Sequence, residues 1–185
     1  FETLLGDGIP VRVFDIAQGA RPISIITEKG KVTRSVIKSI TYLDEIGVIK
    51  LESVGMGIKS RIIHRVISRI AAAGINIKTV ISSMTSMLIL VSRGDLDSCC
   101  HILSEFSPME IDQVECYNDL SLIALVGEGI ARRRGIAARV LSTVTAKNIN
   151  IRLISYGSSR VAIYLLVDRR YRTGAIRALH REFFE

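Results

Sequence analysis

The sequence predicts an α+β fold made of two ferredoxin-like units, each a βαββαβ arrangement with an antiparallel sheet and helices on one face. Three observations support this prediction. Residues 62–77, IIHRVISRIAAAGINI, are repeated at 136–151 as IAARVLSTVTAKNINI, with eight of sixteen aligned positions identical. Upstream, VGMGI at 54–58 matches VGEGI at 126–130. The same order of strand and helix patterns follows in both copies, which indicates a duplicated supersecondary unit.

The first copy opens with a strand over 48–53, where apolar and polar residues alternate before a glycine-containing turn. A helix follows from Ser60, a suitable N-cap, with isoleucine and valine recurring at helical spacing until Gly74 ends it. The remaining predicted elements are strands over 75–82 and 85–92, a helix over 96–106 and a strand over 109–117.

The second copy repeats this order. Its predicted elements are strands over 120–126, 150–156 and 161–167 and helices over 135–147 and 171–183. Residues 1–46 do not repeat, but 9–14 and 22–26 have the apolar character of short strands. A further strand is predicted over 36–42, and it would complete the second unit by crossing to its sheet.

Composition and cysteine usage exclude several classes of protein. The chain has 185 residues, 48% of them hydrophobic, and no apolar run approaches the roughly 20 residues that span a bilayer. We therefore expect a cytoplasmic protein without membrane contact. Cys99, Cys100 and Cys116 lack the spacing of a zinc site or a disulfide framework, so we expect reduced thiols and no metal.

A net charge of +7 raises the possibility of an anionic partner such as nucleic acid. Dense basic clusters occur only at 132–134 and 168–172, and we interpret them as solvated surface. The RNA-recognition fold shares the predicted strand order and stacks bases on aromatic residues of its central strands. Residues 75–92 contain no aromatic residue, and Tyr156 and Tyr164 are the only ones in the matching strands of the second copy, so no nucleic acid is expected.

Glycine-bearing loops lead from the first strand into the first helix of each copy. Backbone N–H groups at a helix N-terminus can bind an anion such as an amino-acid carboxylate, which favours a small-molecule sensor. Turn geometry explains Gly55, Gly57, Gly127 and Gly129 at least as well. The loops alone therefore leave both interpretations open.

The paired motifs resemble the tandem ACT domains of aspartokinase. The similar stretches are VGMGI…GINIKTVISS in the first copy, LIALVGEGIARRRGIAARVLSTVTAKNINIRLISYGSS in the second, and the terminal ALHREFFE. The resemblance covers about residues 36–185. It implies a parent enzyme that uses ATP and Mg to phosphorylate aspartate at the start of lysine, threonine and methionine synthesis. The catalytic Lys-Phe-Gly-Gly signature is absent, so no catalytic residue and no cofactor are expected in this chain.

The resemblance also implies a division of the chain. Residues 1–35 would be the end of the catalytic domain and a linker, 36–47 a strand of the second ACT unit, 48–118 the first unit and 119–185 the rest of the second. In this family the first unit is inserted within the second, and homodimers form through the ACT units. The competing interpretation is an ACT-type amino-acid sensor attached to another enzyme or to a transcription regulator.

The family's effector, lysine or threonine, binds between first ACT units. Carried over position by position, the implied effector-binding residues are Met56, Gly57, Ser60, Arg61, Ile62, Ile63, Asn76, Ile77, Lys78, Ser83 and Met84. Loop and helix N–H groups suit a carboxylate, while Asn76 and Ser83 could bond polar ligand atoms. We expect Ile62, Ile63 and Ile77 to be core residues rather than ligand contacts.

Three positions depart from the family pattern. Lysine-inhibited members have acidic residues where this chain has Lys78 and Met84. Family members in general have a glycine at the head of the first helix, where this chain has Arg61. An ammonium-bearing effector would meet a cation with no carboxylate to offset its desolvation. Lysine is therefore disfavoured in the usual pose, and threonine, another effector or a lost response remain open.

Overall fold

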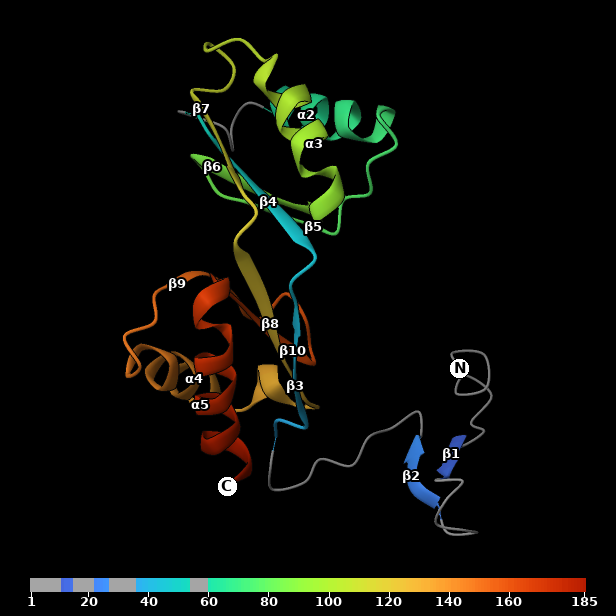
Figure 1. Ribbon diagram of the computed structural model, residues 1–185, viewed down its shortest axis with the longest axis vertical. Coiled ribbons are helices and arrows are strands. Elements are labelled where there is room, and N and C mark those ends of the chain that lie inside the picture. The colour runs from blue at the N-terminus through green and yellow to red at the C-terminus, as the bar shows by residue number, and fades with distance from the viewer. Residues whose placement is uncertain (1–10, 15–21, 27–35, 54–59) are drawn as a thin grey trace.

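The structure, a computed structural model, describes residues 11–14, 22–26, 36–53 and 60–185 (Figure 1). These residues form two four-stranded antiparallel sheets, each with two α-helices, and a separate two-stranded sheet of β1 (Val11–Phe14) and β2 (Pro22–Ile26). The predicted α+β fold with two ferredoxin-like units is confirmed. None of the described helices combines the length and the apolar character needed to cross a bilayer.

The first unit has its strands in the order β5-β6-β4-β7, all antiparallel. Helices α2 and α3 cover one face of this sheet (Figure 1). Its elements are β4 (Ile46–Glu52), α2 (Ser60–Ala72), β5 (Thr79–Ser82), β6 (Ser86–Ser92), the 3₁₀ turn η1 (Arg93–Asp95), α3 (Leu96–Ser104) and β7 (Gln113–Tyr117).

The second unit has the strand order β3-β8-β10-β9 and is covered by α4 and α5. Its elements are β3 (Ser39–Leu43), β8 (Leu120–Val126), η2 (Ile130–Arg132), α4 (Ile136–Thr145), β9 (Ile151–Ser155), β10 (Ala162–Asp168), η3 (Arg169–Tyr171) and α5 (Arg172–Phe184). Strand β3 precedes the whole first unit in sequence but pairs with β8. The first unit is therefore inserted within the second, as predicted.

The central strands are buried on both faces, which the alternation at 48–53 did not predict. In β4, Ile49 and Leu51 point into the core beneath α2 and α3, whereas Ile46 and Val48 point to the opposite face. There they meet Leu120 and Leu166 of the second unit. Because successive side chains of a strand face opposite ways, one strand contributes to its own core and to the contact between units.

Strand β5 begins four residues later than the sequence predicts. Gly74 has a positive φ of 71°, and the Ile75 amide donates to the Ile70 carbonyl to close the end of α2. This is the hydrogen bonding of a glycine C-cap, which uses backbone groups that a strand would otherwise pair. Pairing with β6 begins only when the Lys78 amide donates to the Leu90 carbonyl at 2.8 Å.

The prediction of three reduced thiols is correct for Cys99 and wrong for Cys100 and Cys116. Cys99 lies in the core of the first unit, where desolvation, and to a smaller extent the charge of Asp95, raises the pKa of its thiol to about 11. Packing of α3 on β7 brings the Cα atoms of Cys100 and Cys116 to 6.5 Å, and the two form a disulfide. The spacing of the cysteines in the sequence gave no signal for this disulfide, because the disulfide depends on the tertiary packing of α3 against β7.

Reduction of the Cys100–Cys116 disulfide should lower the free energy of unfolding by about 3 kcal/mol, the chain-entropy value for a loop of similar length. Urea unfolding with and without dithiothreitol measures this change, and Cys100→Ser should remove the dithiothreitol effect. In the reduced native protein, Cys99 should resist iodoacetamide at pH 8 because its thiol stays protonated. Equal labelling of all three cysteines would contradict the buried position of Cys99.

Gly47→Ala should destabilise the protein by about 1–3 kcal/mol through overpacking. A Cβ at Gly47 would lie 2.7 Å from Cβ of Leu96, where β4 passes the start of α3. Gly94→Ala is the matched control, since a Cβ there meets nothing within 4 Å. Thermal unfolding of both variants measures the difference, and equal melting temperatures would show that β4 and α3 are less tightly packed.

Candidate functional site

A partly buried carboxylate joins the two units. Asp44 lies in the turn between β3 and β4, and its side chain is 13% exposed. Its Oδ1 accepts a 2.7 Å hydrogen bond from the Ser121 hydroxyl, and its Oδ2 pairs with Arg172 and, at 3.6 Å, with Arg169. Its carbonyl accepts a 2.9 Å bond from Arg93 of the first unit. Residues of both units therefore converge on this one turn.

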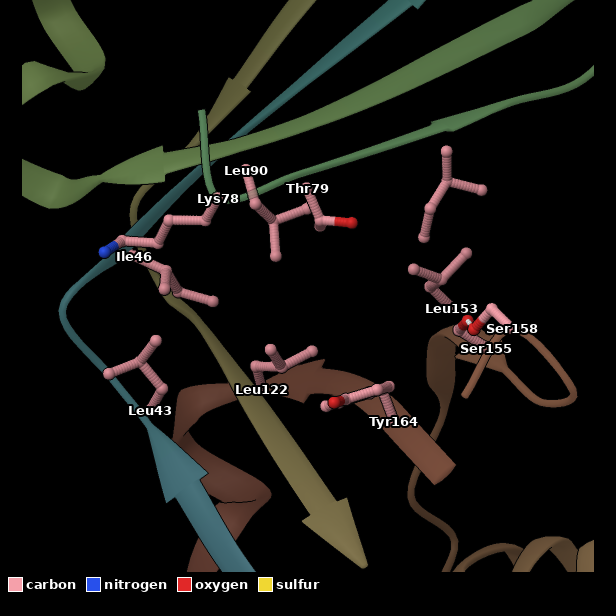
Figure 2. A pocket seen from close by; sticks show the side chains of 11 residues that line it. Leu43, Ile46, Lys78, Thr79, Leu90, Leu122, Leu153, Ser155, Ser158 and Tyr164 are labelled. Atoms are coloured by element: carbon pink, nitrogen blue, oxygen red, sulfur yellow. Dashed lines mark hydrogen bonds between the residues drawn. The ribbon is translucent and has the colours of Figure 1, made fainter. Parts of the chain in front are cut away.

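The open faces of the two sheets enclose a cavity of about 230 Å³ beside this junction (Figure 2). We call it the inter-unit cavity. Both units contribute to it, and its lining consists of Leu43, Ile46, Lys78, Thr79, Ile81, Leu90, Leu122, Leu153, Ser155, Ser158 and Tyr164. Figure 2 shows Lys78 at one end, beside Ile46, and the Ser155–Ser158 pair at the opposite side. Leucine and isoleucine side chains form most of the wall between them.

The inter-unit cavity can accommodate a small ligand with an anionic group and an apolar body. Lys78 is its one charged lining residue, and Thr79, Ser155, Ser158 and Tyr164 supply hydroxyl groups. The hydroxyls of Ser155 and Ser158 lie 2.7 Å apart. Few polar groups in a mostly apolar cavity are typical of small-molecule sites. Since none of the described residues that line the cavity is acidic, a cationic ligand group would find no counter-charge among them.

Of the predicted effector-binding residues that the structure describes, Lys78 alone lines this cavity, and it is an exposed residue. Met56 and Gly57 lie outside the described residues, and Ser60 is described only as the first residue of α2. Ile62 is part of the core of the first unit, and Ile63 and Ile77 pack against that core, as the sequence indicates. Arg61 and Asn76 are exposed.

Ser83 and Met84 occupy the β5–β6 turn. The Ser83 hydroxyl accepts from the Ser86 amide at 3.0 Å and lies within hydrogen-bond distance of the Ser86 carbonyl and hydroxyl. Its hydrogen bonds therefore stabilise the hairpin. The Met84 side chain is among the most exposed hydrophobic side chains, at 68%. Apart from Lys78 in the cavity lining and Ser60 at the start of α2, the described members of the predicted set are thus core residues, turn residues and exposed side chains.

The equivalent glycine loop of the second unit is described, and its glycines serve backbone geometry. Gly129 and Gly135 have φ values of 83° and 82°, which side-chain-bearing residues rarely adopt. A groove of about 600 Å³ lies beside this loop, with Arg132, Arg133 and Arg160 among its lining residues. Among the described residues, no three His, Cys, Asp or Glu side chains are placed to hold a metal ion.

Sequence analysis did not identify Ser155, Ser158 and Tyr164 as site residues. Ser155 falls within the predicted strand over 150–156, Ser158 falls in the connection to the next predicted strand, and Tyr164 was considered only as a possible base-stacking residue. Tyr156 donates its hydroxyl to the Ile130 carbonyl at 3.2 Å and so anchors the loop after β8. The only signal for the serines was their place in a stretch that resembles aspartokinases.

Comparison with known proteins gives one family and several relatives. The ACT domain family matches residues 123–183. The bifunctional aspartokinase/homoserine dehydrogenase of Haemophilus influenzae is 28% identical over 188 residues, covering 98% of this chain and 23% of that protein.

Two solved structures share the fold. The aspartate kinase of Clostridium acetobutylicum has a TM-score of 0.87 at 23% identity, and the match covers 97% of this chain and 42% of the kinase chain. Aspartokinase III of E. coli, in complex with lysine and aspartate, has a TM-score of 0.79 at 21% identity and covers 100% of this chain and 41% of that one. The chain thus spans less than half the length of these relatives. Nearly the whole chain is thus similar in sequence and in fold to aspartokinases, and its residues 123–183 match the ACT domain family, which supports an ACT regulatory region of the aspartokinase type.

Proposed function

We propose that this chain is the allosteric regulatory region of an aspartate kinase that phosphorylates L-aspartate with ATP and Mg at the start of lysine, threonine and methionine synthesis. The observation that carries the proposal is the match of nearly the whole chain, duplicated and inserted units included, to aspartokinases. Residues 1–35 would then belong to the end of the catalytic domain and its linker. The region supplies no catalytic residue, works in the cytoplasm and forms a homodimer through its ACT units.

The proposed effector is an amino acid whose carboxylate pairs with Lys78. The E. coli relative was solved with lysine. In this chain, Lys78 would repel a second ammonium group, and no acidic residue lines the inter-unit cavity. Threonine carries no side-chain charge, and its hydroxyl and methyl groups suit the hydroxyl-bearing, mostly apolar lining. The proposal therefore favours threonine over lysine.

Regulation would act through the relative orientation of the two units. Two chain connections cross between them, at 44–45 and 118–119, and both lie near the Asp44 junction. A ligand between the sheets changes the equilibrium between two orientations of the units only if it binds one orientation more tightly than the other. Lys78 belongs to the first unit and Ser155 to the second, and both line the cavity. A ligand that contacts both residues would therefore depend on the relative orientation of the units.

Isothermal titration of the purified chain should show saturable heat with threonine and little with lysine. Lys78→Met should weaken threonine binding about tenfold, because the variant loses a charge-assisted contact to the carboxylate. Arg134→Met removes an exposed cation outside the cavity and should leave the affinity unchanged. Tight lysine binding would contradict the charge argument.

Asp44→Asn should lower the free energy of unfolding by about 2–3 kcal/mol, since it removes the carboxylate that pairs with Arg172 and leaves Arg169 only its exposed pair with Glu45. Glu45→Gln is the matched control. The Glu45 side chain is 74% exposed and lies 3.8 Å from Arg169, so its loss should cost less than about 0.5 kcal/mol. Chemical denaturation measures both values, and equal stability of the two variants would show that Asp44 does not hold the units together.

The alternative, an ACT sensor of another enzyme or of a transcription regulator, shares every feature of these two units. Assay of the full-length protein for ATP-dependent phosphorylation of aspartate separates the two. Kinase activity that changes when the effector is added supports the kinase proposal. A full-length protein that does not phosphorylate aspartate contradicts that proposal.

A further inference from the structure

The net positive charge of the chain comes from residues 119–185, which form most of the second unit. Residues 119–185 contain 12 Lys and Arg against 5 Asp and Glu, whereas residues 1–118 contain 13 of each. The whole net charge of +7 therefore lies in the last third of the chain. Neither the inter-unit cavity nor the effector proposal uses this charge.

Part of it surrounds a groove of about 370 Å³ on the helical side of the second unit. The groove, which we call the α5 groove, lies between α5 and the turn that leads from α4 to β9. Four cations line it: Lys147, Arg170, Arg177 and Arg181. No acidic side chain is among its lining residues. Arg177 and Arg181 are one helical turn apart, about 6 Å along the axis, so both extend from the same face of α5.

Small residues keep the α5 groove open. Gly174 and Ala178 share the helix face with the two arginines, and buried Ile149 forms part of the floor. A Cβ at Gly174 would have only the Ile149 Cδ1 atom within 4 Å, at 3.8 Å. The position thus has room for a side chain that the sequence does not provide, and the space is left to solvent or ligand.

The four cations are weakly neutralised within the described part of the chain. Arg170 lies 3.8 Å from Asp168, a carboxylate already held by Arg152 at 3.0 Å. Arg181 lies 3.8 Å from Glu185, and both of these side chains are largely exposed. Lys147 and Arg177 form no salt bridge with any described residue. Exposed pairs at such distances contribute little, so the groove keeps most of its positive charge.

We propose that the α5 groove binds the polyphosphate chain of a small ligand, either inorganic pyrophosphate or a nucleoside diphosphate. A single carboxylate would leave most of the four cations uncompensated, whereas two linked phosphates bring a charge of about −3 with several acceptor oxygens. Arginine pairs with phosphate oxygens through two parallel N–H groups, and three of the four cations are arginines. The site lies on the helical face of the second sheet, away from the inter-unit cavity, and does not depend on the proposed amino-acid effector.

Titration of the 185-residue chain with pyrophosphate and, separately, ADP tests the proposal in low-salt buffer without magnesium. Saturable binding with one site per chain is expected. Arg177→Gln should weaken it about fivefold, and the double variant Arg177→Gln with Arg181→Gln about twentyfold, while circular dichroism stays unchanged because both side chains are exposed. Arg134→Gln removes the same charge from an exposed arginine outside the α5 groove and should change the affinity less than about twofold.

The two ligands distinguish what is recognised. Equal affinities for pyrophosphate and ADP would show that the groove recognises the phosphates alone. Tighter ADP binding would indicate further contacts between the nucleoside and the apolar residues Ile149 and Ala178.

Absence of saturable binding, or equal weakening by Arg134→Gln and Arg177→Gln, would overturn the proposal in favour of a solvated basic surface. Binding of a single-stranded oligonucleotide far more tightly than either small ligand would overturn it in favour of nucleic acid. Failure of threonine to bind would bear only on the effector site.

Discussion

The carboxylate of Asp44 is the constraint on which the arrangement of the two units depends. It is placed where the chain leaves the second sheet and enters the first, and its side chain is only 13% exposed there. A partly buried charge without partners is costly, and here Ser121, Arg169 and Arg172 from the second unit are those partners. The backbone at the same residue bonds to Arg93 of the first unit. The junction therefore defines one orientation of the two units through directional contacts.

The apolar contact between the units supports the same orientation but specifies it less sharply. Ile46, Val48 and Leu90 of the first sheet meet Leu120 and Leu166 of the second. Such contact is non-directional and tolerates small rotations. Ile46 and Leu90 of this contact also line the inter-unit cavity. A ligand in the cavity would contact both units, so its affinity would depend on their relative orientation.

Duplication produced two units with the same backbone and different surfaces. The repeated helices α2 and α4 keep their apolar spacing, because both cover the same kind of sheet. Surface charge is free of that requirement and has diverged, with the excess of basic residues carried by the second unit. Its α5 groove lies beside helix α5, whereas the inter-unit cavity lies between the two sheets (Figure 2). The molecule thus offers two chemically different surfaces that do not compete for the same residues.

The duplicated fold could be predicted from the sequence, since hydrophobic periodicity and glycine positions report on local structure and on which face of each element is buried. The sequence also indicated that Ile62, Ile63 and Ile77 are core residues rather than ligand contacts; Ile62 lies in the core, and Ile63 and Ile77 pack against it. Only the tertiary structure decided which residues from distant segments meet. The Cys100–Cys116 disulfide depends on the packing of α3 on β7, and the cavity on the meeting of two open sheet faces. Asp44 shows the same limit: one acidic residue in a turn has no local pattern, and its role arises from partners 77 and 128 residues away.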